Sequence, residues 1–66
     1  MEIILYTTHC PQCKLLEKTL KDKNIEYKEE TNVDTMLSLG IQAVPILQVD
    51  DKKMNLKEAL TWVRSN

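Results

Sequence analysis

The first third of the chain contains two different hydrophobic patterns. Residues 3–6, Ile-Ile-Leu-Tyr, are apolar without interruption, which is typical of a strand that is covered on both faces of a sheet. From Pro11 to about Lys23, apolar side chains recur three and four positions apart, at Cys13, Leu16 and Leu20. This spacing predicts an amphipathic helix, and Pro11 suits its first turn because the amide hydrogen that proline lacks would be unpaired there.

The middle of the chain predicts a second strand and a short helix. Residues 25–28 alternate apolar and polar side chains as a half-buried strand does, and the preceding helix is the connection that a parallel pair of strands needs. Thr31 or Asn32 can cap the short helix, and Gly40 is placed to end it. We expect one face of that helix to carry Val33, Met36 and Leu37.

The next segment predicts an antiparallel hairpin. Residues 46–49, Ile-Leu-Gln-Val, have the composition of a strand. Asp50 and Asp51 favour a tight turn, which leads into a short strand around Lys53 and Met54.

The final helix is predicted from Leu56 to Arg64. Asn55 and Glu58 have the spacing of a capping box, and the apolar stripe consists of Leu56, Leu60 and Val63. The complete order is β-α-β-α-β-β-α, which indicates an α/β fold with a four-stranded mixed sheet and three helices. No linker, repeat or low-complexity segment divides the sequence, so we expect a single domain over residues 1–66.

Charge and composition exclude several kinds of partner. Nine basic and ten acidic residues give a net charge of −1, and no basic stripe interleaved with aromatic residues follows the chain, so we expect no nucleic-acid partner. The opening residues have no basic region and too short an apolar run for a signal peptide or a membrane helix. We therefore expect a cytoplasmic protein without membrane association, in which paired cysteines indicate redox chemistry or metal binding.

The two cysteines have the spacing of a redox pair. Cys10 directly precedes the first predicted helix, where free amide hydrogens and the positive end of the helix dipole favour a thiolate. Thiols in such positions have pKa values of roughly 3.5 to 7.5 instead of about 8.5, so we expect Cys10 to be the nucleophile. Cys13 lies one turn later on the apolar face, and we expect it to be the more buried, resolving thiol. The predicted activity is dithiol-disulfide exchange without a bound cofactor.

Other interpretations of the pair stay open. Two cysteines at helical spacing can be small core residues, although Cys10 precedes the helix and is not on its buried stripe. A metal site would use His9, Cys10 and Cys13, but the chain has no further cysteine or histidine to complete a zinc site, whereas Cu(I) accepts two thiolates. In the redox interpretation, the imidazole of His9 stabilises the Cys10 thiolate or protonates a leaving thiol.

Two motifs together resemble a known family. Cys10-Pro11-Gln12-Cys13 follows the first strand, and Ala43-Val44-Pro45 precedes the third. Over nearly its whole length the chain resembles a small glutaredoxin-like member of the thioredoxin superfamily. The resemblance implies that Pro45 is cis and that the backbone of Val44 binds substrate beside Cys10. It also implies a substrate contact for Thr8 and supporting roles for Pro11 and Gln12.

The resemblance leaves the electron donor open between glutathione and a thioredoxin reductase. A proline after the first cysteine is typical of glutaredoxins reduced by glutathione, whereas Gln12 is typical of glutaredoxin-like donors that a thioredoxin reductase reduces. Thr7 stands where many glutaredoxins have a lysine for a glutathione carboxylate, and the Gly-Gly turn before the last helix is missing. The implied partners are disulfide-containing proteins, and we expect a monomer.

Two further hypotheses remain. One is a soft-metal carrier that binds Cu(I) through Cys10 and Cys13; small heavy-metal-associated domains also have a C-x-x-C motif, but in the order β-α-β-β-α-β. The other is an electron donor dedicated to a single reductase, which the small size of the chain and the missing glutathione contacts favour.

Overall fold

The computed structural model describes residues 2–65 and contains, within that range, three helices and four strands. The elements are β1 (Ile3–Tyr6), α1 (Pro11–Asp22), β2 (Lys28–Glu30), α2 (Val33–Ser38), β3 (Ile46–Val49), β4 (Lys52–Met54) and α3 (Leu56–Arg64). This order confirms the predicted α/β arrangement. Met1 and Asn66, which belong to the domain predicted over residues 1–66, lie outside the described residues.

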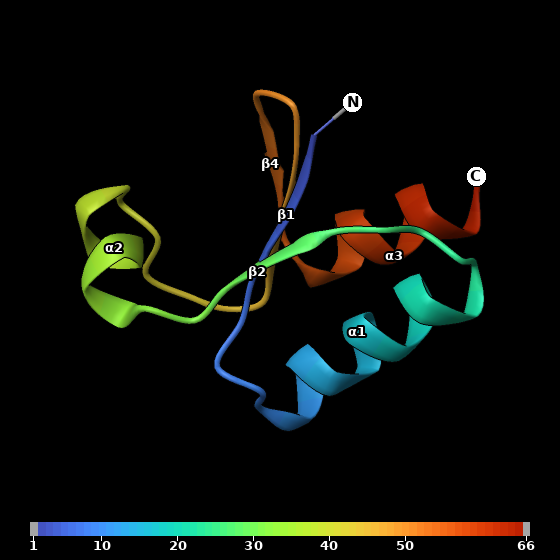
Figure 1. The fold of residues 1–66 in the computed structure, drawn as a ribbon, viewed down its shortest axis with the longest axis horizontal. Coiled ribbons are helices and arrows are strands. Elements are labelled where there is room, and N and C mark those ends of the chain that lie inside the picture. The colour runs from blue at the N-terminus through green and yellow to red at the C-terminus, as the bar shows by residue number, and fades with distance from the viewer. Residues whose placement is uncertain (1, 66) are drawn as a thin grey trace.

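The four strands form one mixed sheet in the order β2-β1-β3-β4. β1 pairs in parallel with β2, because α1 provides the long crossover that returns the chain in the same direction. β1 and β3 are antiparallel, with Tyr6 opposite Ile46, and β3 and β4 form the predicted hairpin. β1 lies in the interior of the sheet, between β2 and β3 (Figure 1).

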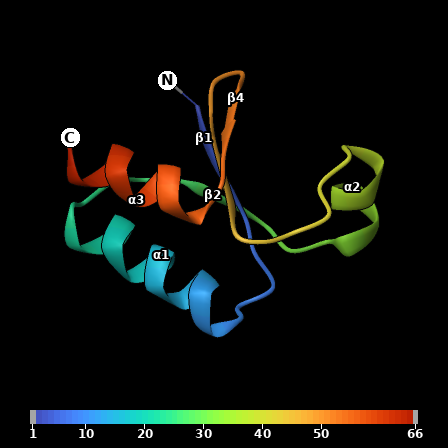
Figure 2. The ribbon, with the colours of Figure 1, turned by 180° about the vertical axis from the view of Figure 1, so that it is seen from behind.

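The sheet separates two hydrophobic clusters, because successive side chains of β1 point to opposite faces. Leu5 packs with buried side chains of α1 and α3 in the larger cluster. Tyr6 packs with Met36 of α2 and with Ile41 in the smaller one. Figure 2 shows α1 and α3 side by side, with α2 well apart from them, as does the opposite view in Figure 1. The helix pair thus supports one face of the sheet and holds the first turn of α1 near the end of β1.

The second strand begins later than the sequence predicted. It runs from Lys28 to Glu30, whereas the prediction was 25–28. The apolar residues that suggested the earlier start, Ile25 and Tyr27, are partly buried against the α1 and α3 side of the core before the strand begins. Their alternation therefore reflects packing of the connection after α1, not pairing with β1.

The predicted apolar face of α2 is also wrong in part. Met36 is buried against the sheet, but Val33 and Leu37 are 53% and 60% exposed. Of the six residues of this helix, Met36 is the one that is buried. The side chains of Val33 and Leu37 are left at the surface.

Local signals at the helix ends are confirmed. Asn32 caps α2 and accepts a hydrogen bond from the backbone of Thr35, and Gly40 takes the positive φ of 80° that ends this segment. Asn55 and Glu58 form the predicted capping box of α3. Within residues 2–65, none of the helices has both the length and the apolar character needed to cross a membrane.

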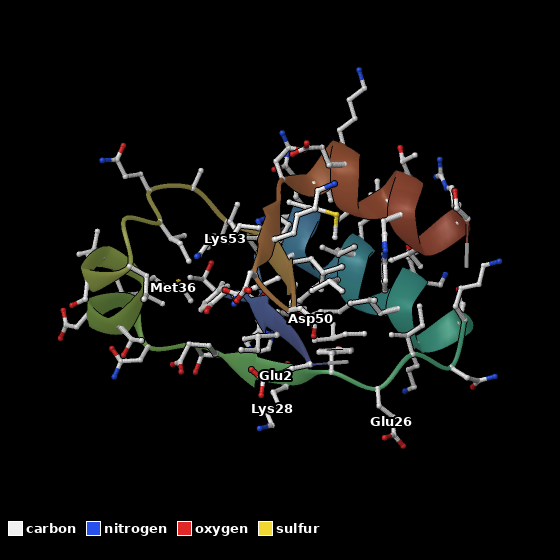
Figure 3. All side chains as sticks on the ribbon, turned by 90° about the horizontal axis from the view of Figure 1, so that it is seen from above. Glu2, Glu26, Lys28, Met36, Asp50 and Lys53 are labelled. Carbon is white, nitrogen blue, oxygen red and sulfur yellow. The ribbon has the colours of Figure 1, made fainter. Side chains whose placement is uncertain are left out.

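The turn after β3 closes against the start of the chain. Asp50 has a φ of 54°, and its backbone N–H donates to the carbonyl of Glu2. The backbone N–H of Glu2 in turn donates to the Asp50 carboxylate at 2.9 Å. Figure 3 shows both residues at this end of the sheet, with Lys28 next to Glu2. The turn thereby fixes the end of β1 that is remote from the cysteines.

Candidate active site

Cys10 is the N-cap residue of α1. Its backbone is extended, and its sulfur accepts a hydrogen bond from the backbone N–H of Cys13 at 3.2 Å. Pro11 follows in the first helical turn, as the sequence predicted. The sulfur therefore uses one of the amide hydrogens that have no partner at a helix start, and it lies at the positive end of the α1 dipole.

Cys13 lies beneath Cys10 on the buried stripe of α1. Its side chain is 0% exposed, whereas Cys10 is half-buried, and both cysteines are free thiols. The predicted difference in burial is confirmed. A substrate sulfur can reach Cys10 directly, while Cys13 is accessible only to a group already attached to Cys10.

The environment of Cys13 favours its thiolate. Burial raises the pKa of this thiol, but interactions with the Cys10 and Thr7 side chains and with the Thr8 and Cys10 backbone outweigh it and lower the pKa to about 7. The dithiol is thus prepared to supply a thiolate near neutral pH.

The reduced protein is therefore expected to show an early thiol titration. A lowered pKa means that the proton leaves at lower pH, so the ultraviolet absorbance of thiolate should rise with pH through about 7. An ordinary thiol would give this rise in absorbance at a pH of about 8.5. The oxidised protein, which lacks thiols, is the control. A single rise at about 8.5 or above in the reduced protein would contradict the stabilisation described for Cys13.

His9 contacts α1 through a different residue. Its backbone has a φ of 61°, and its ring Nδ1 lies 3.2 Å from Oε2 of Glu17. Glu17 is one turn beyond Cys13 on the helix. The predicted action of the imidazole on Cys10 stays a prediction, while the contact that the structure provides for His9 is with Glu17.

Thr7 and Glu17 are two residues to which the sequence interpretation gave no role at the site. Thr7 is 0% exposed, and its hydroxyl donates to Oε2 of Glu17 at 2.8 Å and accepts the backbone N–H of His9 at 3.0 Å. Two signals were present in the sequence: a threonine directly after a buried apolar run, and a glutamate four residues after Cys13 on the same helical face. Only the fold shows that these two side chains meet.

The Val44-Pro45 motif lies at the same end of the sheet as Cys10. Because Tyr6 pairs with Ile46, the segment that leaves β1 and the segment that enters β3 are neighbours. The peptide bond between Val44 and Pro45 is cis, which confirms the expectation from the resemblance. Pro45 is buried and Val44 half-buried. The binding role predicted for Val44 stays a prediction.

The other predicted site residues surround the dithiol at the surface. Thr8, Pro11 and Gln12 are all exposed. Thr8 precedes Cys10 by two positions and its backbone also hydrogen-bonds to the Cys13 sulfur. The exposed side chain of Thr8 is thus available to a substrate, as its predicted contact role requires.

The metal-ligand geometry differs from the set that the sequence suggested. Among residues 2–65, the group of three potential ligands that converge is His9, Glu17 and Glu29, whose ligand atoms lie within 4.8 Å of one another. The predicted set of His9, Cys10 and Cys13 is not this group. Since Glu17 already accepts hydrogen bonds from Thr7 and approaches His9, we interpret these residues as a hydrogen-bonded cluster.

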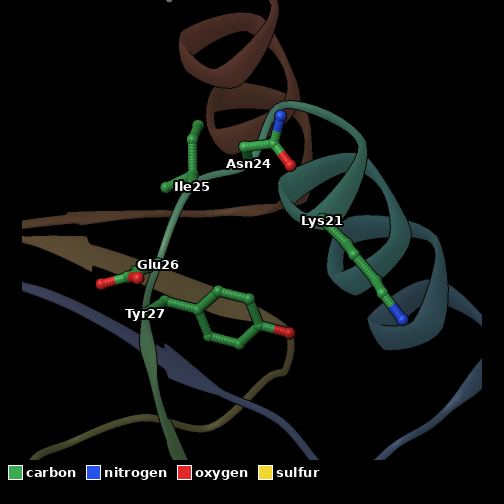
Figure 4. A pocket seen from close by; sticks show the side chains of 5 residues that line it. All are labelled: Lys21, Asn24, Ile25, Glu26 and Tyr27. Carbon is green, nitrogen blue, oxygen red and sulfur yellow. The ribbon is translucent and has the colours of Figure 1, made fainter.

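A surface hollow at the opposite end of α1 does not involve the dithiol. It is lined by Lys21, Asn24, Ile25, Glu26 and Tyr27 (Figure 4). At 1.5 Å per residue, Lys21 is about 16 Å along the helix from Cys10. The hollow is wide open and contains no cysteine, so the candidate chemistry remains at the first turn of α1.

Comparison with known proteins finds no match among protein family models, curated protein sequences or solved structures. The fold and the site define an α/β protein that has two free thiols at the start of a helix, at the end of the sheet where the cis Val44-Pro45 bond lies.

Proposed function

We propose that this protein is a thiol-disulfide oxidoreductase with a thioredoxin-like fold, similar to the glutaredoxins. The observation that carries the proposal is the pair of sulfurs at the first turn of α1. Cys10 is accessible and accepts the backbone N–H of Cys13 at 3.2 Å, while Cys13 is fully buried behind it. One thiol is placed to meet a substrate and the other to meet only the first thiol.

The reaction follows from these positions. The Cys10 thiolate attacks one sulfur of a substrate disulfide, which forms a mixed disulfide and releases the other substrate sulfur as a thiolate that takes up a proton. Cys13 then attacks the sulfur of Cys10. The bond between Cys10 and the substrate breaks, the substrate leaves fully reduced, and the two electrons transferred come from the Cys10 and Cys13 thiols.

Two features support the finer assignment of fold and substrate contact. The strand order β2-β1-β3-β4 and the cis Val44-Pro45 bond are both compatible with a thioredoxin-like fold. In this proposal the Val44 backbone pairs with an extended segment of a protein substrate, next to the exposed Thr8. The substrates are disulfide-containing proteins of the cytoplasm, and the protein acts as a monomer without a bound cofactor.

The proposed donor is a thioredoxin reductase, with glutathione as the alternative. Many glutaredoxins have a lysine at the position of Thr7, but Thr7 is fully buried and hydrogen-bonded to Glu17, so it supplies no positive charge at the surface. The segment that precedes α3, residues 51–55, has no glycine pair. Both features weaken the case for a glutathione site.

A redox titration in defined thiol buffers tests the function. The expected result is a reversible two-electron transition between the dithiol and a Cys10–Cys13 disulfide, measured by alkylation and mass. A midpoint potential of about −270 mV, the value of thioredoxin, supports a reductase as donor. A midpoint potential of about −200 to −230 mV, the range of glutaredoxins, supports glutathione. The Cys13→Ser variant is the control, since it has no second thiol. If the wild-type protein forms no intramolecular disulfide, the proposal is wrong and Cu(I) binding is the next function to measure.

A further inference from the structure

Three lysines form a row on the outer side of α1, which lies at the lower edge of the molecule in Figures 1 and 2. Lys14, Lys18 and Lys21 follow one another at intervals of four and three positions, so they share one side of the helix. All three are exposed, and Leu15, three positions before Lys18, is 50% exposed. At 1.5 Å per residue, this lysine row extends from about 6 Å to about 16 Å beyond Cys10 along the helix axis.

The acidic residue best placed to neutralise the lysine row is bound elsewhere. Glu17 lies three positions after Lys14 and four before Lys21, which is the spacing of helical ion pairs. Its carboxylate instead accepts the Thr7 hydroxyl at 2.8 Å and lies 3.2 Å from Nδ1 of His9. Among residues 2–65, no ion pair involves a lysine of the row. The row therefore keeps its positive charge on a protein whose net charge is −1.

We infer that the lysine row is a docking surface for an acidic segment of the disulfide-containing protein that Cys10 attacks. This inference deepens the proposed oxidoreductase function and rests on it. Carboxylates of the segment lie along the lysines, and an apolar side chain of the segment packs on Leu15. Because the row begins one helical turn after Cys10, a segment bound along it holds its disulfide at the accessible sulfur. Docking changes no bond of the exchange reaction but raises the rate of productive encounter.

The dimensions and composition of α1 specify the segment further. Its sequence, PQCKLLEKTLKD, contains no aromatic residue on which a nucleic-acid base could stack, whereas an exposed leucine suits a protein partner. Asp22 ends the helix four positions after Lys18 and repels an acidic chain that continues beyond the row. About 16 Å of extended chain corresponds to about five residues. The acidic residues of the partner are therefore within about five positions of its reactive cysteine.

The test uses three peptides that differ only in charge. Each has an intramolecular disulfide followed by five residues, of which three are glutamate, glutamine or lysine and one is leucine. Reduced protein is mixed with each peptide under single-turnover conditions, and reduction is measured by alkylation and mass. Each rate constant is divided by that of the neutral reductant dithiothreitol with the same peptide, which removes differences in the intrinsic reactivity of the peptides.

The expected result is a preference that depends on the lysine row. At low salt the wild-type protein reduces the glutamate peptide about tenfold faster than the lysine peptide. At about 1 M salt, where the Debye length is about 3 Å, the preference disappears. In Lys14→Gln/Lys18→Gln it falls below about twofold even at low salt, while the rate with the glutamine peptide is unchanged. Leu15→Ala slows the reduction of all three peptides by the same factor, because each contains the leucine.

Lys52→Gln/Lys53→Gln is the matched control. Both lysines are exposed in β4, so this variant has the same change in net charge while α1 keeps its sequence. It should retain the preference for the glutamate peptide. Glutamine and lysine have similar helix propensities, so the variant in α1 is expected to keep its helix, which circular dichroism verifies.

The outcomes that contradict the docking surface differ from those that contradict the function. Equal rates with the three peptides in the wild-type protein overturn the docking surface and leave the oxidoreductase function intact. The same follows if the preference persists in Lys14→Gln/Lys18→Gln, or if it is lost equally in Lys52→Gln/Lys53→Gln. If the wild-type protein reduces none of the peptides, the oxidoreductase function is wrong, and the docking surface with it.

Discussion

Cys10→Ser is expected to reduce disulfide reduction to the uncatalysed rate. A serine hydroxyl at this position does not ionise near neutral pH, so the N–H of Cys13 and the α1 dipole have no thiolate to stabilise. Because Cys13 is 0% exposed, it is not placed to replace Cys10 as the attacking group. The measurement is the initial rate of reduction of a peptide disulfide, with the electron donor in excess.

Cys13→Ser is the matched partner of this variant. It keeps the accessible Cys10 and its hydrogen bond from the backbone of residue 13, so the first attack still occurs. The mixed disulfide then accumulates, because no second thiol resolves it. Mass spectrometry should find substrate attached to Cys13→Ser and none attached to Cys10→Ser. Wild-type activity in Cys10→Ser would refute the assignment of the nucleophile.

The same trapped complex distinguishes a general reductase from a dedicated donor. Incubation of Cys13→Ser with a mixture of disulfide proteins should attach many of them if the protein is general. Attachment of one enzyme alone would instead favour the hypothesis of an electron donor dedicated to that enzyme.

Leu5→Ala is expected to have the largest effect on stability. Leu5 lies in the central strand β1, is 0% exposed and packs with α1 and α3 in the larger cluster. Truncating a fully buried leucine typically costs about 3 to 5 kcal/mol, because the cavity does not collapse. At about 0.05 to 0.15 kcal/mol per residue, a chain of 66 residues has a free energy of unfolding of only about 3 to 10 kcal/mol.

Urea unfolding of the reduced protein measures this loss, with Leu37→Ala as control. Leu37 is 60% exposed on α2, so the same chemical change there should alter the free energy of unfolding by no more than about 0.5 kcal/mol. Equal losses in the two variants would show that the sheet face beneath α1 and α3 is not the main core.

Features that depend on neighbours along the chain could be predicted from the amino-acid sequence alone. The spacing of Cys13, Leu16 and Leu20 sufficed to predict α1 and the burial of the second cysteine, because helical periodicity relates positions three and four apart. The capping box of Asn55 and Glu58 is equally local. The cis bond before Pro45 followed from the family resemblance, since nothing in the adjacent residues requires it.

Features that depend on how distant segments pair were set by the three-dimensional fold. The start of β2 at Lys28 was set by its register with β1, and the exposure of Val33 and Leu37 by how little of α2 contacts the sheet. The meeting of Thr7 with Glu17 requires α1 to fold back along β1, which no local pattern encodes. A sequence motif therefore predicted where the two sulfurs lie relative to α1, whereas the groups around them were determined by packing between elements.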